Sequence, residues 1–209
     1  MNTDVVIIGA GPSGIFTAME LIRRGSKRHI TIVEKGNAIE NRFCPKVKTK
    51  KCMNCKPYCH ITTGFSGAGA FSDGKLSLSY EVGGDFPSLV GENHAQELID
   101  YADKIYLEFG ADAKIEGVAD PEAVKEIRRR AIQAGLKLVD CPIRHMGTEK
   151  AQAIYYAIEQ YLLENGVEII FGWECVDLVL EGGACLGVRI RRKDEERELR
   201  AERTVIATG

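Results

Sequence analysis

The chain has 209 residues, of which 44% are hydrophobic and 28% charged, so it is long enough for one or two folded domains and too apolar for disorder. Its net charge of −2 gives no electrostatic reason to expect a nucleic-acid or membrane-surface partner. No apolar run approaches the roughly 18 residues that span a bilayer, and the first residues lack the basic start of a secretory signal. We therefore expect a cytoplasmic protein whose partner is a small-molecule substrate or a redox partner.

The first 34 residues predict a strand, a helix and a second strand. Asp4–Ile8 is a continuous apolar run rich in β-branched residues, which is typical of a buried parallel strand. The next segment places Ile15, Ala18, Met19, Leu21 and Ile22 on one helical face, and Gly25 ends the pattern. Ile30–Val33 is again apolar and β-branched, so it completes a β-α-β unit.

A G-x-G-x-x-G sequence joins the first strand to the helix, which is the context that a dinucleotide fingerprint requires. Gly9 permits a tight turn, Gly11 lets the backbone approach a pyrophosphate, and Gly14 lets the helix pack on the strand. Pro12 and Ser13 open the helix, and a helix N-terminus attracts phosphate groups.

Glu34 ends the second strand, 20 residues after the last glycine of the fingerprint. A carboxylate at this place accepts hydrogen bonds from a ribose hydroxyl and repels a 2′-phosphate. The ligand we expect is therefore FAD or NAD and not NADP. Lys35 follows Glu34, and both are expected at the cofactor.

Residues 36–90 are rich in Gly, Ser, Pro, Cys and Lys and show little periodicity, so we expect a long functional loop. Apolar stripes then predict helices over 92–109 and over 121–135, the second of which has Asp120 as its N-cap. A third helix follows Thr148 as its cap and ends at Asn165-Gly166.

The last part of the chain predicts β-structure. Residues 167–171 form an apolar strand that we place beside the second strand. Three further segments predict an antiparallel meander, namely 174–180, 185–192 and 197–203. Residues 204–207 predict a final strand beside the first one, and we expect the natural chain to continue after Gly209.

These elements predict an α/β fold, a Rossmann-like FAD-binding domain with a loop-rich cysteine segment. We assign 1–90 and 138–209 to a discontinuous FAD-binding domain that is incomplete at its C-terminus, and 91–137 to a helical insertion. The turn Ala207-Thr208-Gly209 and the pair Glu34-Lys35 resemble flavoproteins with two dinucleotide-binding domains, in which the late turn returns to the FAD.

Two longer stretches narrow the resemblance. The run from Cys59 to Ser77, CHITTGFSGAGAFSDGKLS, and the run from Pro142 to Thr148, PIRHMGT, are similar to signatures of a little-characterised family of FAD-dependent dehydrogenases. The resemblance covers essentially the whole chain but only the N-terminal half of such proteins. It implies that the backbone of Cys175 meets the adenine and that one loop lies near the flavin, through Ser66, Gly67, Gly69, Ala70, Phe71, Ser72 and Lys75.

Four of the seven cysteines, Cys44, Cys52, Cys55 and Cys59, lie within 16 residues. Their spacing allows one tetrahedral thiolate site, which suits an iron–sulfur cluster or zinc. Six nearby cations, Arg42 among them, would offset the thiolate charge. Free or redox-active thiols are the remaining interpretation, so the sequence predicts a thiol site without deciding the metal.

The catalytic residues are not identified by any motif. Lys75, Arg144 and His145 are candidates, because Lys75 would add positive charge beside the flavin and the other two precede a helix N-terminus. The function that these observations favour is an FAD-dependent oxidoreductase with an unknown substrate. The alternatives are an NAD-dependent dehydrogenase and a non-catalytic nucleotide- and metal-binding redox sensor.

Overall fold

The computed structural model describes residues 2–209, which divide into two compact units. Residues 2–71 and Tyr155–Gly209 form the first unit, and Ser72–Ile154 form the second. The second unit is larger than the 91–137 insertion expected from the sequence, because β3 (Lys75–Ser77) pairs with β4 (Ile143–His145) in antiparallel fashion. The assignment of the units to separate functions stays a prediction.

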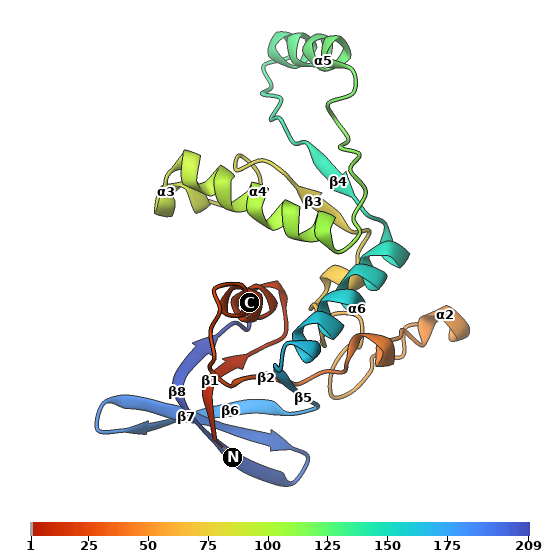
Figure 1. Ribbon diagram of the computed structural model, residues 1–209. Helices are drawn as coiled ribbons and strands as arrows, with labels where there is room; N and C mark the ends of the chain where they lie inside the picture. Colours follow the sequence, from red (N-terminus) through yellow and green to blue (C-terminus); the bar gives the residue numbers. More distant parts are fainter. Residues whose placement is uncertain (1) are drawn as a thin grey trace. The chain divides into compact units, whose positions relative to one another are not determined.

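The first unit is built on a six-stranded sheet with the order β5-β2-β1-β8-β7-β6 (Figure 1). β1 (Asn2–Ile8) runs parallel to β2 (Ile30–Glu34), and α1 (Pro12–Arg23) connects them. β5 (Glu168–Phe171) pairs with β2, and β8 (Glu195–Ile206) pairs with β1. Both neighbours of the first β-α-β unit were predicted from the sequence, and both are confirmed.

The meander is also present, with β6 (Glu174–Glu181) and β7 (Ala184–Arg192) leading into β8. The sequence predicted two strands after 196, but β8 is one continuous strand. Arg200 marks the change of partner, because it lies opposite Gly187 in β7 and opposite Asn2 in β1. No turn residue interrupts the chain there, so β8 carries it directly from the meander to the end of β1.

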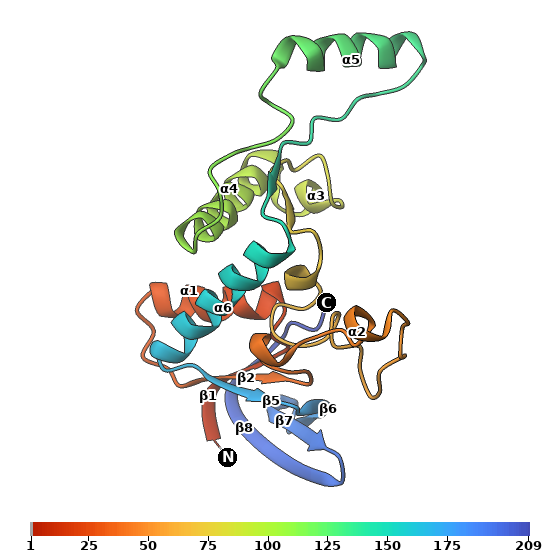
Figure 2. The ribbon, with the colours of Figure 1, turned by 90° about the vertical axis from the view of Figure 1, so that its right-hand side faces the viewer.

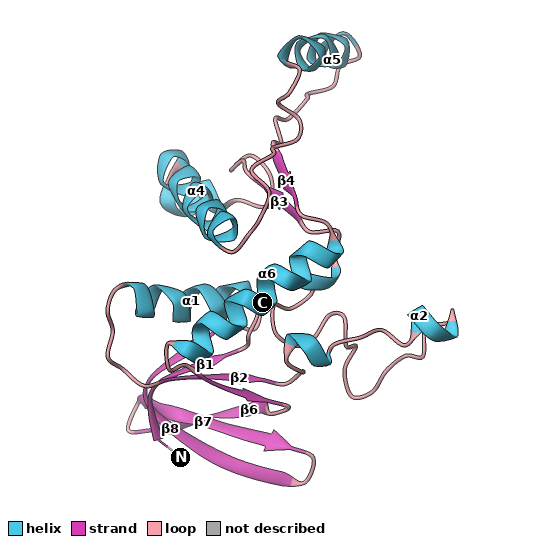
Figure 3. Cartoon of the chain, turned by 45° about the vertical axis from the view of Figure 1, so that its right-hand side comes forward, coloured by secondary structure: helices cyan, strands magenta, loops and turns pink. Residues whose placement is uncertain are grey.

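Two layers of side chains bury the sheet. α1 and the C-terminal part of α6 (Thr148–Glu164) cover one face of β1 and β2, as Figures 2 and 3 show. Ile15 and Met19 of α1 and Ile158 and Leu162 of α6 are fully buried there. The other face packs a cluster around Trp173, with Val6, Ile8, Val33, Val188, Ile190, Leu199 and Ala201. Each fully buried aliphatic side chain contributes about 1.5–3 kcal/mol relative to an exposed one.

The remaining elements are short or belong to the second unit. The loop after β2 contains the 3-10 turns η1 (Ile39–Asn41) and η2 (Gly69–Phe71) and the short helix α2 (Lys46–Thr49). The second unit adds α3 (Phe86–Val90), α4 (Glu92–Glu108) and α5 (Pro121–Gln133) to the pair β3–β4. Within residues 2–209, no helix combines the length and the apolar character needed to cross a membrane.

The predicted helix caps differ in outcome. Asp120 caps α5, because its Oδ1 accepts a hydrogen bond of 2.9 Å from the backbone N of Ala123, as the sequence predicted. Thr148, by contrast, is the first helical residue of α6, and its hydroxyl donates to the carbonyl of Ser72 at 2.8 Å. The prediction of a Thr148 cap is therefore wrong, because the hydroxyl finds a tertiary acceptor instead of a helix amide.

A buried carboxyl makes the first unit sensitive to pH. Glu159 on α6 is only 2% exposed, and its Oε2 accepts a hydrogen bond of 3.1 Å from the backbone N of Ile39. Burial raises the pKa of Glu159 to about 7, and the charge of Glu40 adds to the rise against the opposing hydrogen bond from Ile39. The protonated form is thus favoured by folding.

We expect the free energy of unfolding to fall as the pH rises from about 4.5 to about 7, because the folded protein binds the Glu159 proton more tightly than the unfolded chain. Glu159→Gln should remove this loss and gain about 2–3 kcal/mol over the wild type at pH 8, with little difference at pH 4. Urea unfolding at both pH values measures the effect. Glu164→Gln, on the exposed side of α6, is the control. Equal pH dependence of wild type and Glu159→Gln would contradict the assignment.

Candidate dinucleotide-binding site

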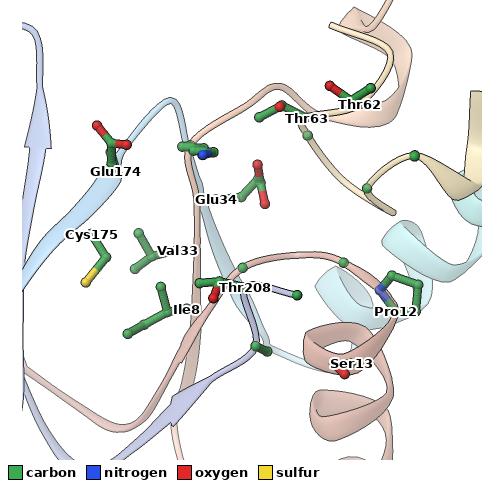
Figure 4. Close-up of a pocket in the computed structure, with 18 of the residues that line it drawn as sticks. Ile8, Pro12, Ser13, Val33, Glu34, Thr62, Thr63, Glu174, Cys175 and Thr208 are labelled. Atoms are coloured by element: carbon green, nitrogen blue, oxygen red, sulfur yellow. The ribbon is translucent and has the colours of Figure 1, made fainter. Parts of the chain in front are cut away.

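A cavity of about 630 Å³ lies in the first unit, at the C-terminal ends of β1, β2 and β8 (Figure 4). Its volume falls in the usual range of small-molecule and cofactor sites, and ligands of open α/β sheets bind at this edge. The residues that line it come from five segments: Ile8, Gly9, Gly11, Pro12 and Ser13; Val33, Glu34 and Lys35; Thr62, Thr63, Gly64, Gly67 and Ala68; Trp173, Glu174 and Cys175; Ala207, Thr208 and Gly209.

The structural environment of the glycine differs at each of the three fingerprint positions. Gly9 has a φ of +100°, and a Cβ there would lie 2.6 Å from the carbonyl oxygen of Ala207. A Cβ at Gly14 would lie 2.0 Å from the carbonyl oxygen of Gly9, so only glycine lets α1 pack against the turn. Gly11 has a φ of −75°, and no atom of the described residues lies within 4 Å of a Cβ built on it. Gly11 is therefore not needed by the backbone and keeps space open at the cavity.

The Glu34 side chain holds the glycine turn to the end of β2 (Figure 4). It is only 6% exposed. Its Oε2 accepts a hydrogen bond of 2.9 Å from the N of Ala10, and its Oε1 accepts one of 2.7 Å from the N of Gly36. A carboxylate has about four acceptor sites, so two remain for a ribose hydroxyl. The sequence analysis did not predict that Glu34 holds the glycine turn. Binding of a ribose hydroxyl by Glu34 stays a prediction.

Glu34→Ala should therefore destabilise the protein even without a cofactor. The substitution leaves the buried amides of Ala10 and Gly36 without acceptors, which costs about 1–3 kcal/mol. Thermal unfolding of flavin-free protein measures this loss, with the exposed Glu196→Ala as the control. An unchanged melting temperature in the flavin-free state would show that Glu34 does not hold the turn.

The loop expected near the flavin is divided between the two units. Gly67 lines the cavity, while Ser66 and Ala70 are fully buried behind the wall, and Gly69 packs against Tyr155. Ser72 and Lys75 belong to the second unit. Thr62, Thr63 and Gly64 also line the cavity. The sequence analysis did not name them as cofactor residues, and their only signal was that they lie within the signature run from Cys59 to Ser77.

The cavity wall around residues 173–175 contains a second group that the sequence analysis missed. Trp173 is 3% exposed, and the guanidinium carbons of Arg192 and Arg197 lie 4.8 and 4.6 Å from its ring centre. Glu174 and the predicted Cys175 follow it along the wall. Burial raises the pKa of the Cys175 thiol, which keeps the thiol neutral. The signal available in the sequence was the single tryptophan of the chain, two residues before Cys175.

The three catalytic candidates all lie in the second unit. Lys75 lies opposite His145 in the β3–β4 pair, and its ammonium forms an exposed ion pair with Asp73 at 2.8 Å. Arg144 is 2% exposed and binds the Asp103 carboxylate through two hydrogen bonds, Nε to Oδ1 at 2.5 Å and Nη2 to Oδ2 at 2.7 Å. Its Nη1 donates to the carbonyl of Asp112. The donors of Arg144 are thus engaged within its own unit.

The four clustered cysteines do not form a metal site among the described residues. Cys52 and Cys59 are exposed, Cys44 and Cys55 are half-buried, and α2 forms between Cys44 and Cys52. Across residues 2–209, no three His, Cys, Asp or Glu side chains are placed to hold one metal ion. The structure gives no support to the predicted metal site. Hydrogen bonds from the backbone of Ile61 and the hydroxyl of Thr62 lower the pKa of Cys59, which favours its thiolate.

The family of pyridine nucleotide-disulphide oxidoreductases matches residues 3–209, and this range is nearly the whole chain. The chain belongs to this family. The family resemblance and the Rossmann-like fold that the sequence predicted are thereby confirmed. An uncharacterized protein of Clostridium beijerinckii is 39% identical over 72 residues, which are 34% of this chain and 13% of that protein.

Solved structures of similar fold match this chain over its whole length. A 3-ketosteroid-Δ4-(5α)-dehydrogenase from Rhodococcus jostii matches with a TM-score of 0.60, 16% identity and 46% of its own chain. An L-amino acid deaminase from Proteus vulgaris matches with a TM-score of 0.54, 18% identity and 47% of its own chain. The chain therefore spans less than half the length of either protein.

Proposed function

We propose that the protein is an FAD-dependent oxidoreductase that acts on a small organic molecule. The observation that carries the proposal is that the glycine turn, Glu34 and the returning turn Ala207–Gly209 meet at one cavity within the first unit. The family of the chain supports the same interpretation. Bound FAD would supply the transfer of a hydride or an electron pair. The chain's own residues bind and orient the cofactor.

The lining fits the parts of FAD one by one. The space at Gly11 and the N-terminus of the 12-residue helix α1 suit the pyrophosphate. The free acceptor sites of Glu34 suit a ribose hydroxyl, and the wall from Trp173 to Cys175 suits the adenine. The backbone around Gly67 and Ala68 allows close approach of a flat ring.

The strands that come between β5 and β8 in the chain favour FAD over NAD. An NAD domain usually continues with further β-α units, whereas here β6, β7 and β8 form a meander that returns to the cavity. An NAD-dependent dehydrogenase is therefore the second candidate. The names of the solved relatives refer to a ketosteroid and to L-amino acids, so the shared fold does not select a substrate.

Cofactor titration tests the proposal directly. The purified protein, freed of nucleotides, is titrated with FAD, NAD and NADP, and we expect stoichiometric FAD and a yellow colour that bleaches on anaerobic reduction. A colourless protein that binds NAD would support the dehydrogenase instead. Tight FAD binding without turnover on any electron donor or acceptor would favour a redox sensor.

The predicted metal is tested on the same sample. Within residues 2–209 the four cysteines are not placed to hold an iron–sulfur cluster or zinc in the arrangement described above. Stoichiometric iron or zinc in anaerobically purified protein would mean that this loop rearranges around a metal. Four thiols that titrate freely in metal-free protein would support the interpretation as free thiols.

A further inference from the structure

A buried arginine lies directly behind the wall of the cavity. Arg42 follows η1 and is only 4% exposed. Its Nε donates to the carbonyl of His60 at 2.9 Å, and its Nη1 donates to the carbonyl of Phe65 at 2.5 Å and to Oγ of Ser66 at 3.3 Å. Its guanidinium carbon lies 4.5 Å from the ring centre of Phe71. One side chain thus fixes the loop from residue 60 to residue 71.

The neighbouring glycines leave room for this side chain. Gly64 has a φ of +126°, and a Cβ on it would lie 2.7 Å from Cδ and 2.9 Å from Nε of Arg42. A Cβ on Gly36 would lie 2.5 Å from the backbone N of Gly64. The end of β2, the loop at Gly64 and the guanidinium are therefore packed as closely as the backbone permits.

Hydrogen bonds connect Arg42 to the glycine turn. The N of Ser66 donates to the carbonyl of Ala10 at 2.7 Å, and the N of Ala10 donates to the Glu34 carboxylate at 2.9 Å. Glu34 and Arg42, which carry opposite charges and are both more than nine-tenths buried, thus hold the two sides of the contact between Ala10 and Ser66. Gly67, next to Ser66, lines the cavity.

The charge of Arg42 is incompletely satisfied. Its Nη2 is buried and has no hydrogen-bond partner among the described residues. Burial lowers the pKa of Arg42 to about 10, while Glu34 and Cys59 oppose the change, so the guanidinium stays protonated at neutral pH. Burying a charge without a bonded counter-ion destabilises the folded state, so an apolar side chain at position 42 would be more stable on this ground alone. A charge at this place is therefore better explained by a role at the cavity than by packing.

We propose that Arg42 is a positioning residue, which holds the cavity wall at Gly64–Gly67 against the glycine turn and gives the flavin a positive potential through that wall. The inference rests on the proposed FAD function. A planar guanidinium donates to two carbonyls at once and stacks on Phe71, and lysine keeps the charge but cannot reproduce this geometry. The two contributions, geometry and charge, are therefore separable by substitution.

The test compares Arg42→Met, Arg42→Lys and the exposed control Arg24→Met. Arg42→Met should bind FAD about tenfold more weakly or worse, and its bound FAD should have a more negative midpoint potential. Arg42→Lys should also bind FAD more weakly but keep a midpoint potential close to that of the wild type. Arg24→Met should match the wild type in both measurements.

Wild-type affinity and potential in a folded Arg42→Met would overturn the inference. If Arg42→Met does not fold, folded Arg42→Lys decides, and unchanged FAD affinity there overturns it. If the wild type binds no FAD, the proposed function fails and the positioning role is judged by amide hydrogen exchange of the flavin-free protein. In that state the amide of Ser66 should exchange faster in Arg42→Lys than in the wild type, and equal exchange would refute the positioning role.

Discussion

Gly11→Val should fold normally and lose its FAD. Gly11 has an ordinary φ of −75°, and no described atom lies within 4 Å of a Cβ placed there, so the fold tolerates a side chain. The same open space is where the cofactor pyrophosphate would approach the backbone. Occupying it with three carbons should weaken FAD binding by about 100-fold or more, which corresponds to about 3 kcal/mol.

Gly14, the last glycine of the same fingerprint, is the control for Gly11. A Cβ at Gly14 would lie 2.0 Å from the carbonyl oxygen of Gly9, so Gly14→Ala should fail to fold or lose stability before any ligand is added. Circular dichroism, thermal unfolding and flavin stoichiometry are measured on both variants. A folded Gly11→Val with stoichiometric FAD would contradict the placement of the pyrophosphate, and a fully stable Gly14→Ala would contradict the packing of α1.

The parts of the fold that could be predicted are those with a local signal. The β-branched run before Gly9 and the periodic helix after it predict the β-α-β unit, and the motif predicts a nucleotide at its turn. The single strand β8 could not be predicted as one element, because strand patterns do not show a change of partner at Arg200. That change depends on β1, which lies about two hundred residues earlier in the chain.

Residues of the candidate site could be predicted only where they lie on strands, helices or motifs that have a local sequence signal. Glu34 was found by its distance from the fingerprint, but its bonds to Ala10 and Gly36 follow from a turn that the sequence does not specify. Arg42 was grouped with the cations around the cysteines, because nothing in a loop without periodicity marks one cation as buried. The cysteine spacing likewise does not reveal that α2 forms between Cys44 and Cys52.

The second prediction with a large expected effect is a loss of stability when Arg144 is replaced. Its side chain is 3% exposed and is bound to Asp103, whose side chain is 14% exposed, while Nη1 satisfies the carbonyl of Asp112. Removing one partner of a buried ion pair leaves the other charge without compensation, which costs about 3–5 kcal/mol. Arg144→Met should therefore destabilise the second unit by about this amount, as measured by urea unfolding and by faster proteolysis within residues 72–154.

The sequence proposed Arg144 as a catalytic candidate, and the same variant separates a catalytic role from a structural one. Asp103→Asn should be destabilised as well, because the pair is lost from the other side, whereas Lys75→Met, which loses only an exposed pair with Asp73, should retain wild-type stability. Flavin content of the folded fraction should stay unchanged, because every residue that lines the cavity belongs to the first unit. If Arg144→Met instead keeps its stability and its flavin but loses turnover once a substrate is known, Arg144 binds substrate and its ion pair with Asp103 is not needed for folding.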